Sequence, residues 1–202
     1  MGEGASEMSR AAEVRRETRE TKVYVKLILD GEGKAEVSTG IGFLDHMLEL
    51  FAKHGLFDLE VKAEGDLHVD QHHTVEDVGI CLGEAFSEAL GDKSGIRRFG
   101  FFVLPMFESL ALVSLDICGR GYLRFDVKGL EGKVGDFDCE LVEEFFNGFV
   151  GRAGVTLHIL VPYGSNKHHI IEAIFKAFGR AMDMATGIDE RVKGVPSTKG
   201  VL

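Results

Sequence analysis

Hydrophobic and polar residues alternate along four short segments, and this alternation is typical of β-strands. In the first half, KVYVKLILDG at 22–31 is followed by KAEVSTG at 34–40, with the turn residues DGEG between them. In the second half, LALVSLDICGRG at 110–121 leads in the same way into YLRFDVKG at 122–129. The chain therefore repeats one strand pattern in its two halves.

Apolar residues at helical spacing follow each strand pair. FLDHMLELFAKHG at 43–55 and CELVEEFFNGFVGRAG at 139–154 both end in glycine, and a short strand follows each of them, FDLEVKA at 57–63 and VTLHILV at 155–161. Each half then closes with a long amphipathic helix, over 72–91 and 168–187. Both of these helices begin with a pair of histidines.

This repetition predicts an α+β fold with an internal duplication of two similar units, each a small sheet covered on one side by two helices. Residues 1–17 are polar and charged without an apolar period, and we expect a mobile N-terminal arm there. The first unit is then expected over 18–96 and the second over 97–190, with a tail at 191–202.

The same three residue types recur at the start of the two long helices. His72, His73 and Glu76 match His168, His169 and Glu172. A helix turns about 100° per residue, so the first histidine and the glutamate share one face while the adjacent histidines splay apart. One such group alone could be a solvated surface cluster. Its duplication favours a metal site with imidazole and carboxylate ligands, which suit Mn²⁺, Fe²⁺ or Zn²⁺.

The preceding helices offer two further ligands. His46 lies 26 residues before His72, and Glu144 lies 24 residues before His168. Pseudo-symmetry predicts two mixed sites, with the following membership: His46, His73, Glu76 and His168 in one, and Glu144, His169, Glu172 and His72 in the other.

Composition excludes several classes of function. The 202 residues include 23 Lys and Arg against 33 Asp and Glu, so the net charge of −10 offers no basic surface for nucleic acid. No apolar stretch reaches the roughly 20 residues that cross a bilayer, and the N-terminus lacks a signal-peptide pattern. We expect a cytoplasmic protein with no membrane partner. Three cysteines without CxxC spacing predict reduced thiols rather than a structural zinc site.

Four longer segments resemble a known family. GIGFLDHMLELFAKHG, GDLHVDQHHTVEDVGICLGEA, HHIIEAIFKAFGRAM and the tail PSTKGVL resemble imidazoleglycerol-phosphate dehydratase, a lyase of histidine biosynthesis. The resemblance runs from about Arg19 to Leu202. It implies a small-molecule substrate, D-erythro-imidazoleglycerol phosphate, which loses water to give imidazoleacetol phosphate. It also implies two Mn²⁺ per subunit and a homo-oligomer of 24 subunits built from trimers, with metal sites between subunits.

The resemblance also assigns roles to residues. It makes Glu20 the base that removes a proton, although an exposed charge at a strand edge is the plain alternative. Glu144 stands where many members have histidine, and glutamate can also ligate manganese. The residues expected to contact substrate are Glu20, His46, His54, Arg98, Arg120, Lys176, Ser197, Thr198 and Lys199. The residues expected to act in catalysis are Glu20 and the two histidine-glutamate groups, His72, His73, Glu76, His168, His169 and Glu172.

The expected chemistry draws its electrons from the substrate imidazole. With both ring nitrogens bound to metal, the ring is held as imidazolate, which expels hydroxide and leaves a diazafulvene-like intermediate. Two alternatives remain at this point: a di-metal hydrolase, which usually carries more aspartate ligands, and a metal-binding shell protein without catalysis. Glu20 and the tail around Lys199 favour the dehydratase.

Overall fold

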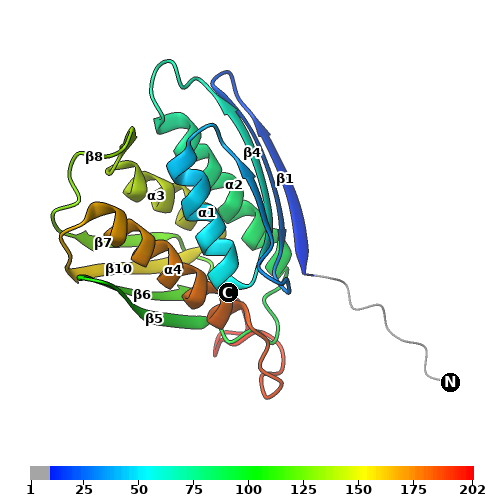
Figure 1. Cartoon of the computed structure of the whole chain (residues 1–202). Helices are drawn as coiled ribbons and strands as arrows, with labels where there is room; N and C mark the ends of the chain where they lie inside the picture. The colour runs from blue at the N-terminus through cyan, green and yellow to red at the C-terminus, as the bar shows by residue number, and fades with distance from the viewer. Residues whose placement is uncertain (1–9) are drawn as a thin grey trace.

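The computed structural model describes residues 10–202, in which two similar halves each form a mixed four-stranded sheet (Figure 1). The first sheet has the order β1-β2-β4-β3 and the second the order β5-β6-β10-β7. The first half contains β1 (Ala11–Glu17), β2 (Thr21–Ile28), β3 (Ala35–Ser38), α1 (Gly42–Gly55), β4 (Asp58–Gly65) and α2 (His72–Leu90). The second contains β5 (Phe99–Met106), β6 (Ser109–Ile117), β7 (Tyr122–Val127), α3 (Leu141–Ala153), β10 (Val155–Tyr163) and α4 (Lys167–Thr186).

The two halves share one topology, which confirms the predicted duplication. In each, the first two strands form an antiparallel hairpin, and the third strand pairs in parallel with the fourth. The DGEG turn therefore does not join neighbouring strands, because β4 lies between β2 and β3. The second half adds a small hairpin before α3, made of β8 (Lys133–Val134) and β9 (Phe137–Asp138).

The expectation of a mobile arm over 1–17 is wrong for residues 11–17, which form the edge strand β1. Val14 is the buried residue of this strand, and it pairs opposite Val25 of β2. Charged side chains surround Val14 in the sequence, so the alternation typical of a strand is hidden there. Residues 1–9 lie outside the described part of the chain.

The four helices lie between the two sheets and pack across the duplication (Figure 1). α2 contacts α3, and α1 contacts α4. Aromatic rings fill the centre, where Phe51 of α1 stacks on Phe178 of α4 with ring centroids 5.0 Å apart. Each sheet is covered on its inner face by its own two helices, as the sequence predicts. Within residues 10–202, no helix is both long and apolar enough to span a bilayer.

Candidate functional site

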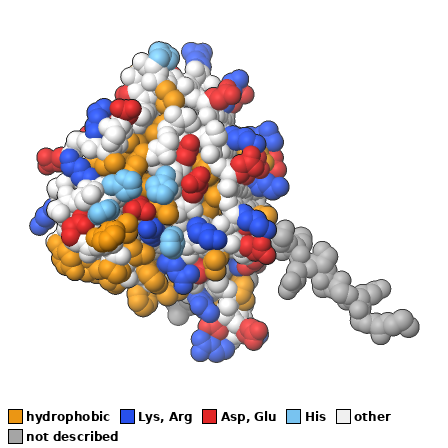
Figure 2. Space-filling view, viewed as in Figure 1, with side chains coloured by type: hydrophobic (Ala, Val, Ile, Leu, Met, Phe, Trp, Pro, Cys, Tyr) orange, Lys and Arg blue, Asp and Glu red, His pale blue; other side chains and the backbone are white. Residues whose placement is uncertain are grey.

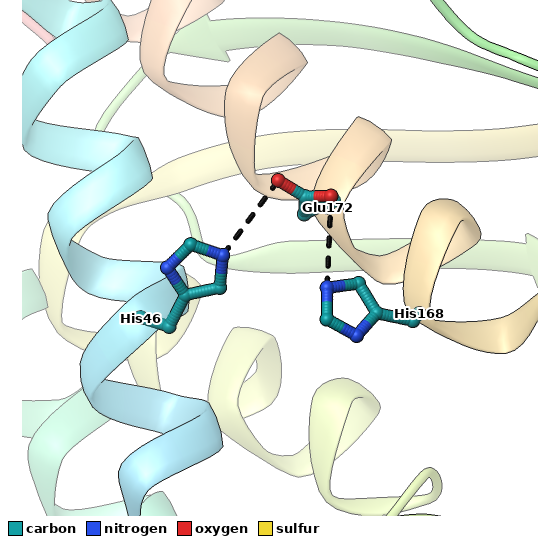
Figure 3. Close-up of side chains that lie close together, drawn as sticks. All are labelled: His46, His168 and Glu172. Carbon is teal, nitrogen blue, oxygen red and sulfur yellow. Dashed lines mark ion pairs between the residues drawn. The ribbon is translucent and has the colours of Figure 1, made fainter.

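The packing of α1 against α4 brings together His46, His168 and Glu172 (Figure 3). His46 Nε2 lies 3.7 Å from Glu172 Oε1, and His168 Nε2 lies 3.6 Å from Glu172 Oε2. One ligand atom from each residue lies within 4.8 Å of the others. Two imidazole nitrogens and one carboxylate oxygen form a donor set that suits Mn²⁺, Fe²⁺ or Zn²⁺. These three residues therefore form a possible metal site.

This site opens on a face where histidines gather over α1 and the start of α4 (Figure 2). α4 begins at this point because Asn166 caps it, with its side-chain oxygen accepting the backbone N–H of His168 at 3.0 Å. One turn beyond Glu172, Lys176 places its Nζ 3.0 Å from Glu172 Oε1. Lys176 therefore lies beside the cluster.

His54 lies near the other end of this helix pair. Burial lowers the pKa of His54, and the positive charges of Lys176 and Arg180 lower it further. Arg180, which the sequence analysis did not single out, donates to the His54 carbonyl at 3.3 Å. His54 is therefore an uncharged donor or acceptor near pH 7.

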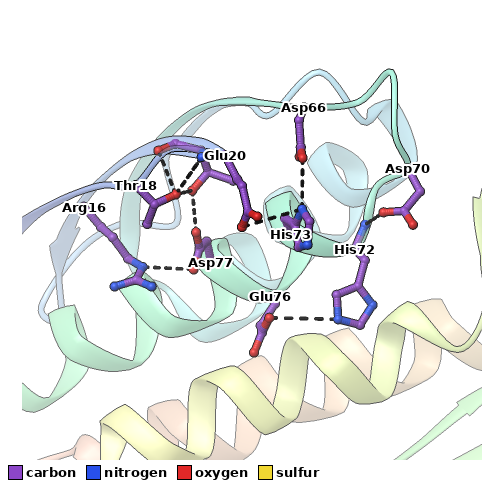
Figure 4. Close-up of polar contacts among 10 residues, drawn as sticks. Arg16, Thr18, Glu20, Asp66, Asp70, His72, His73, Glu76 and Asp77 are labelled. Carbon is purple, nitrogen blue, oxygen red and sulfur yellow. Dashed lines mark hydrogen bonds and ion pairs between the residues drawn. The ribbon is translucent and has the colours of Figure 1, made fainter.

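A second, smaller cluster occupies the equivalent place on α2 (Figure 4). His72 Nε2 lies 3.9 Å from Glu76 Oε2, one helical turn apart as in His168 and Glu172. α3, which carries Glu144, packs closely on this part of α2, since a Cβ on Gly148 would lie 2.7 Å from the Glu76 carbonyl oxygen. The duplication thus gives two related clusters.

Within one chain, the candidate ligands group differently from the predicted pairing. It grouped Glu76 with His46 and His168, whereas the structure groups Glu172 with them. Each glutamate stays with the first histidine of its own helix, because residues i and i+4 share a face. The candidate ligand that the first half of the chain adds to this group is His46 of α1, because α1 packs on α4.

The second histidine of each pair turns away from the first. His72 and His168 lie beside the glutamates of their own helices, whereas His73 and His169 contact carboxylates from other segments. His73 Nδ1 lies 3.0 Å from Asp66 Oδ2, and His169 Nδ1 lies 2.9 Å from Glu108 Oε2. Nε2 is then the ring atom that remains for another ligand.

These contacts shift two pKa values. The hydrogen bond with Asp66 raises the pKa of His73. The pKa of Glu108 falls to about 2, because the carboxylate accepts the Asn166 N–H and contacts His169. Sequence reasoning singled out neither Asp66, which lies in the segment before α2, nor Glu108, which lies at the β5–β6 turn.

Glu20 lies at the tip of the β1–β2 hairpin, with Oε2 3.8 Å from His73 Nδ1 (Figure 4). Asp77 of α2 holds this hairpin, accepting a hydrogen bond from Arg16 Nε at 2.9 Å and another from the Thr21 hydroxyl. Glu20 borders a hollow of about 280 Å³ that Asp66 also lines. The predicted base is thus an accessible carboxylate beside the second histidine of α2.

Comparison with known proteins identifies the family. The family model described as imidazoleglycerol-phosphate dehydratase matches residues 39–182. The chain belongs to this family. The imidazoleglycerol-phosphate dehydratase of Acetivibrio thermocellus is 59% identical over 96% of this chain and 100% of that protein. The one from Thermoanaerobacter pseudethanolicus is 60% identical, again over 96% of this chain and 100% of that protein.

Solved structures of imidazoleglycerol-phosphate dehydratases match the fold. The crystal structure from Staphylococcus aureus aligns with a TM-score of 0.80 and 41% identity, covering 89% of this chain and 99% of that one. The structure from Pyrococcus furiosus, in complex with (S)-C348, aligns with a TM-score of 0.81 and 40% identity, covering 94% and 100%. Membership makes the chain a hydro-lyase of histidine biosynthesis and removes the hydrolase alternative.

Apart from Lys176, the arginines and tail residues expected to contact substrate lie far from the metal cluster within one chain of this dehydratase. Arg98 pairs with Asp116 at 2.7 and 3.0 Å and donates to the Pro196 carbonyl at 2.9 Å. The backbone N–H of Arg98 donates to the carbonyl oxygen of Ala185 in α4. At a rise of 1.5 Å per residue, Ala185 lies about 25 Å along the helix from His168. The other members of this group are exposed or half-buried near the same end: Arg120, Ser197, Thr198 and Lys199.

Proposed function

We propose that this chain dehydrates D-erythro-imidazoleglycerol phosphate to imidazoleacetol phosphate with two Mn²⁺ ions per subunit. The observation that carries the proposal is the pair of duplicated histidine-glutamate clusters at the starts of α2 and α4. Family membership supports the reaction, and the nitrogen and oxygen donors fit manganese.

The ligand sets follow the two clusters. One ion would bind His46, His168 and Glu172, and the other His72, Glu76 and Glu144. His73 and His169 turn away from these clusters, so we assign each of them to an ion of a neighbouring subunit. This sharing agrees with the 24-subunit assembly of trimers that the resemblance implies, because one chain alone leaves each ion short of a ligand.

Held by the two clusters, Mn²⁺ would supply Lewis-acid chemistry that favours the deprotonated form of the substrate imidazole. The ring electrons would then expel the neighbouring hydroxyl, which leaves as water after protonation, and the hydrogen on the next carbon would become acidic. Glu20 would take this proton as the general base. The electron pair of that C–H bond forms the enol, which tautomerises to the ketone product.

The remaining contacts would fix the substrate's phosphate and hydroxyl groups. Lys176 lies beside the first cluster, while Arg98, Arg120, Ser197, Thr198 and Lys199 lie at the far end of α4. We assign this second group, which includes Ser197, Thr198 and Lys199 of the tail at 191–202, to the active site of a neighbouring subunit. We also assign His46 and His54, which both lie on α1, to contacts with the substrate.

Mass spectrometry tests the proposed reaction directly. The purified protein is incubated with imidazoleglycerol phosphate in the presence of Mn²⁺ or of EDTA. The proposal expects loss of one water from the substrate with Mn²⁺ and none with EDTA. Equal turnover in both samples would contradict the metal's role, and no turnover in either would contradict the reaction.

A further inference from the structure

Two glutamates occupy the same position in the two duplicated hairpins. The backbone N–H of Thr18 donates to the Thr21 carbonyl across the β1–β2 turn, so residues 19 and 20 form the tip of this hairpin. Met106 pairs with Ser109 across the β5–β6 turn, so its tip is residues 107 and 108. Glu20 and Glu108 are therefore each the second residue of a two-residue tip, and each lies beside the second histidine of the adjacent long helix.

The contacts of these glutamates differ. Glu108 Oε2 lies 2.9 Å from His169 Nδ1, and its Oε1 accepts the Asn166 N–H at 2.9 Å and the Ser109 hydroxyl at 3.0 Å. Glu20 Oε2 lies 3.8 Å from His73, and 57% of its side chain is exposed. Glu108 is held at both oxygens, whereas Glu20 reaches solvent.

The reason lies in the residue that follows the fourth strand of each half. Asp66 follows β4 and supplies the carboxylate 3.0 Å from His73. Gly164 follows β10 at the equivalent place and has no side chain, and a Cβ there would lie 2.6 Å from the Ser109 hydroxyl. In the second half, the hairpin glutamate is the carboxylate that contacts His169.

We propose that Glu108 is a positioning residue for His169, and that Asp66 performs this task for His73, which frees Glu20 for proton transfer. The inference rests on the proposed function, in which His169 ligates an ion. A carboxylate that accepts Nδ1–H fixes the tautomer whose Nε2 lone pair can bind metal. Phe107 strengthens this placement, with its ring 5.1 Å from that of His169 and its φ at a strained +50°.

Glu108→Gln changes the contact with His169 and keeps the contact with the Asn166 N–H at the start of α4. The Asn166 N–H and the Ser109 hydroxyl occupy Oε1, so the amide NH₂ of glutamine would face His169 Nδ1. The amide would then donate to Nδ1 and move the ring proton to Nε2, which blocks the ligand atom. We expect Mn²⁺ affinity to fall about 10- to 100-fold at the affected sites. The unfolding temperature of the metal-free protein should stay unchanged.

The measurement is a Mn²⁺ titration against a fluorescent chelator, with wild type, Glu108→Gln, Glu20→Gln and the exposed control Glu88→Gln. Glu20→Gln and Glu88→Gln should bind Mn²⁺ like wild type. Wild-type affinity in Glu108→Gln, or an equal loss in Glu20→Gln, would overturn the positioning role. A wild-type protein that binds no Mn²⁺ would overturn both this role and the metal assignment, and it would be seen before any variant is compared.

Discussion

Glu20 and Glu108 are the same residue type at the same hairpin position, and their neighbours decide what each can do. Asp66 occupies Nδ1 of His73 and leaves Glu20 exposed, whereas Gly164 leaves Glu108 as the partner of His169. A carboxylate held by a backbone N–H and an imidazole is a weak base, and the pKa of Glu108 near 2 reflects this. The freer Glu20 is the better candidate for moving a proton.

Glu20→Gln removes that base without changing the size of the side chain. We expect turnover to fall by about 10²- to 10⁴-fold, the usual contribution of a general base. Metal content and assembly should match wild type, because Glu20 is no metal ligand in this account. Steady-state kinetics and elemental analysis check both parts, and near-normal turnover would exclude Glu20 as the base.

His72→Ala removes a ligand that shares a helix face with Glu76. We expect elemental analysis to find about one fewer manganese per subunit, because the site would lose the imidazole that this chain supplies and keep only the carboxylates of Glu76 and Glu144. His158→Ala, a change in β10 away from both clusters, serves as the control. An unchanged metal count in His72→Ala would refute the assignment of this residue.

At the residue scale, the sequence shows which candidate ligands share a helix, but it does not show which residue of another helix joins them. The duplicated histidine-glutamate pattern identifies His168 and Glu172, because their spacing on one helix fixes their relation. The partners of His73 and His169 could not be predicted, since Asp66 and Glu108 reach them only through loop and hairpin geometry.

At the scale of elements, close helix packing sets the geometry of the clusters. Gly83 of α2 and Gly179 of α4 each lie eleven residues after the first histidine of their helix. A Cβ on Gly83 would lie 2.3 Å from the Phe149 carbonyl oxygen, and one on Gly179 would lie 2.6 Å from that of Phe51. Glycine at these places lets α2 approach α3 and α4 approach α1, which keeps the ligand-bearing helices together.

Gly83→Ala should therefore destabilise the fold. Its Cβ would force α2 and α3 apart, and overpacking of this kind costs about 1–3 kcal/mol. The matched control is Gly151→Ala on α3, where a Cβ meets nothing within 4 Å and alanine should stabilise the helix by about 0.5–1 kcal/mol. Chemical denaturation measures both changes. Equal stability in the two variants would contradict the packing argument.

The helices and most strands follow from the sequence because their apolar periods are long and clear. β1 does not, since its one buried residue, Val14, lies among charges. The parallel pairing of β3 with β4 is also beyond the sequence pattern, because it depends on β4 entering the sheet between β2 and β3.

At the scale of the whole molecule, the proposed sharing of ligands needs a surface for other copies. The outer face of β5 exposes large apolar side chains, which contribute to the hydrophobic patch beside the histidines in Figure 2. Their exposed fractions are 57% for Phe99, 63% for Phe101 and 51% for Val103. Such a patch is typical of a protein interface, and we assign it to contact between copies of this chain.

Phe101→Glu places a charge in this patch. We expect the assembly to dissociate into smaller species in light scattering, and manganese content to fall with it, because separated subunits lose shared ligands. Lys26→Glu on the outer face of the first sheet is the control for added negative charge. An assembly that keeps its size in Phe101→Glu would exclude this face from the interface.

We propose that two ions bind where neighbouring subunits meet, and anomalous X-ray diffraction from crystals grown with Mn²⁺ can locate them. We expect two manganese peaks per subunit, one at His46, His168 and Glu172 and the other at His72, Glu76 and Glu144. Each peak should also contact His73 or His169 of another subunit. A single peak, or two peaks whose ligands all come from one chain, would contradict the account.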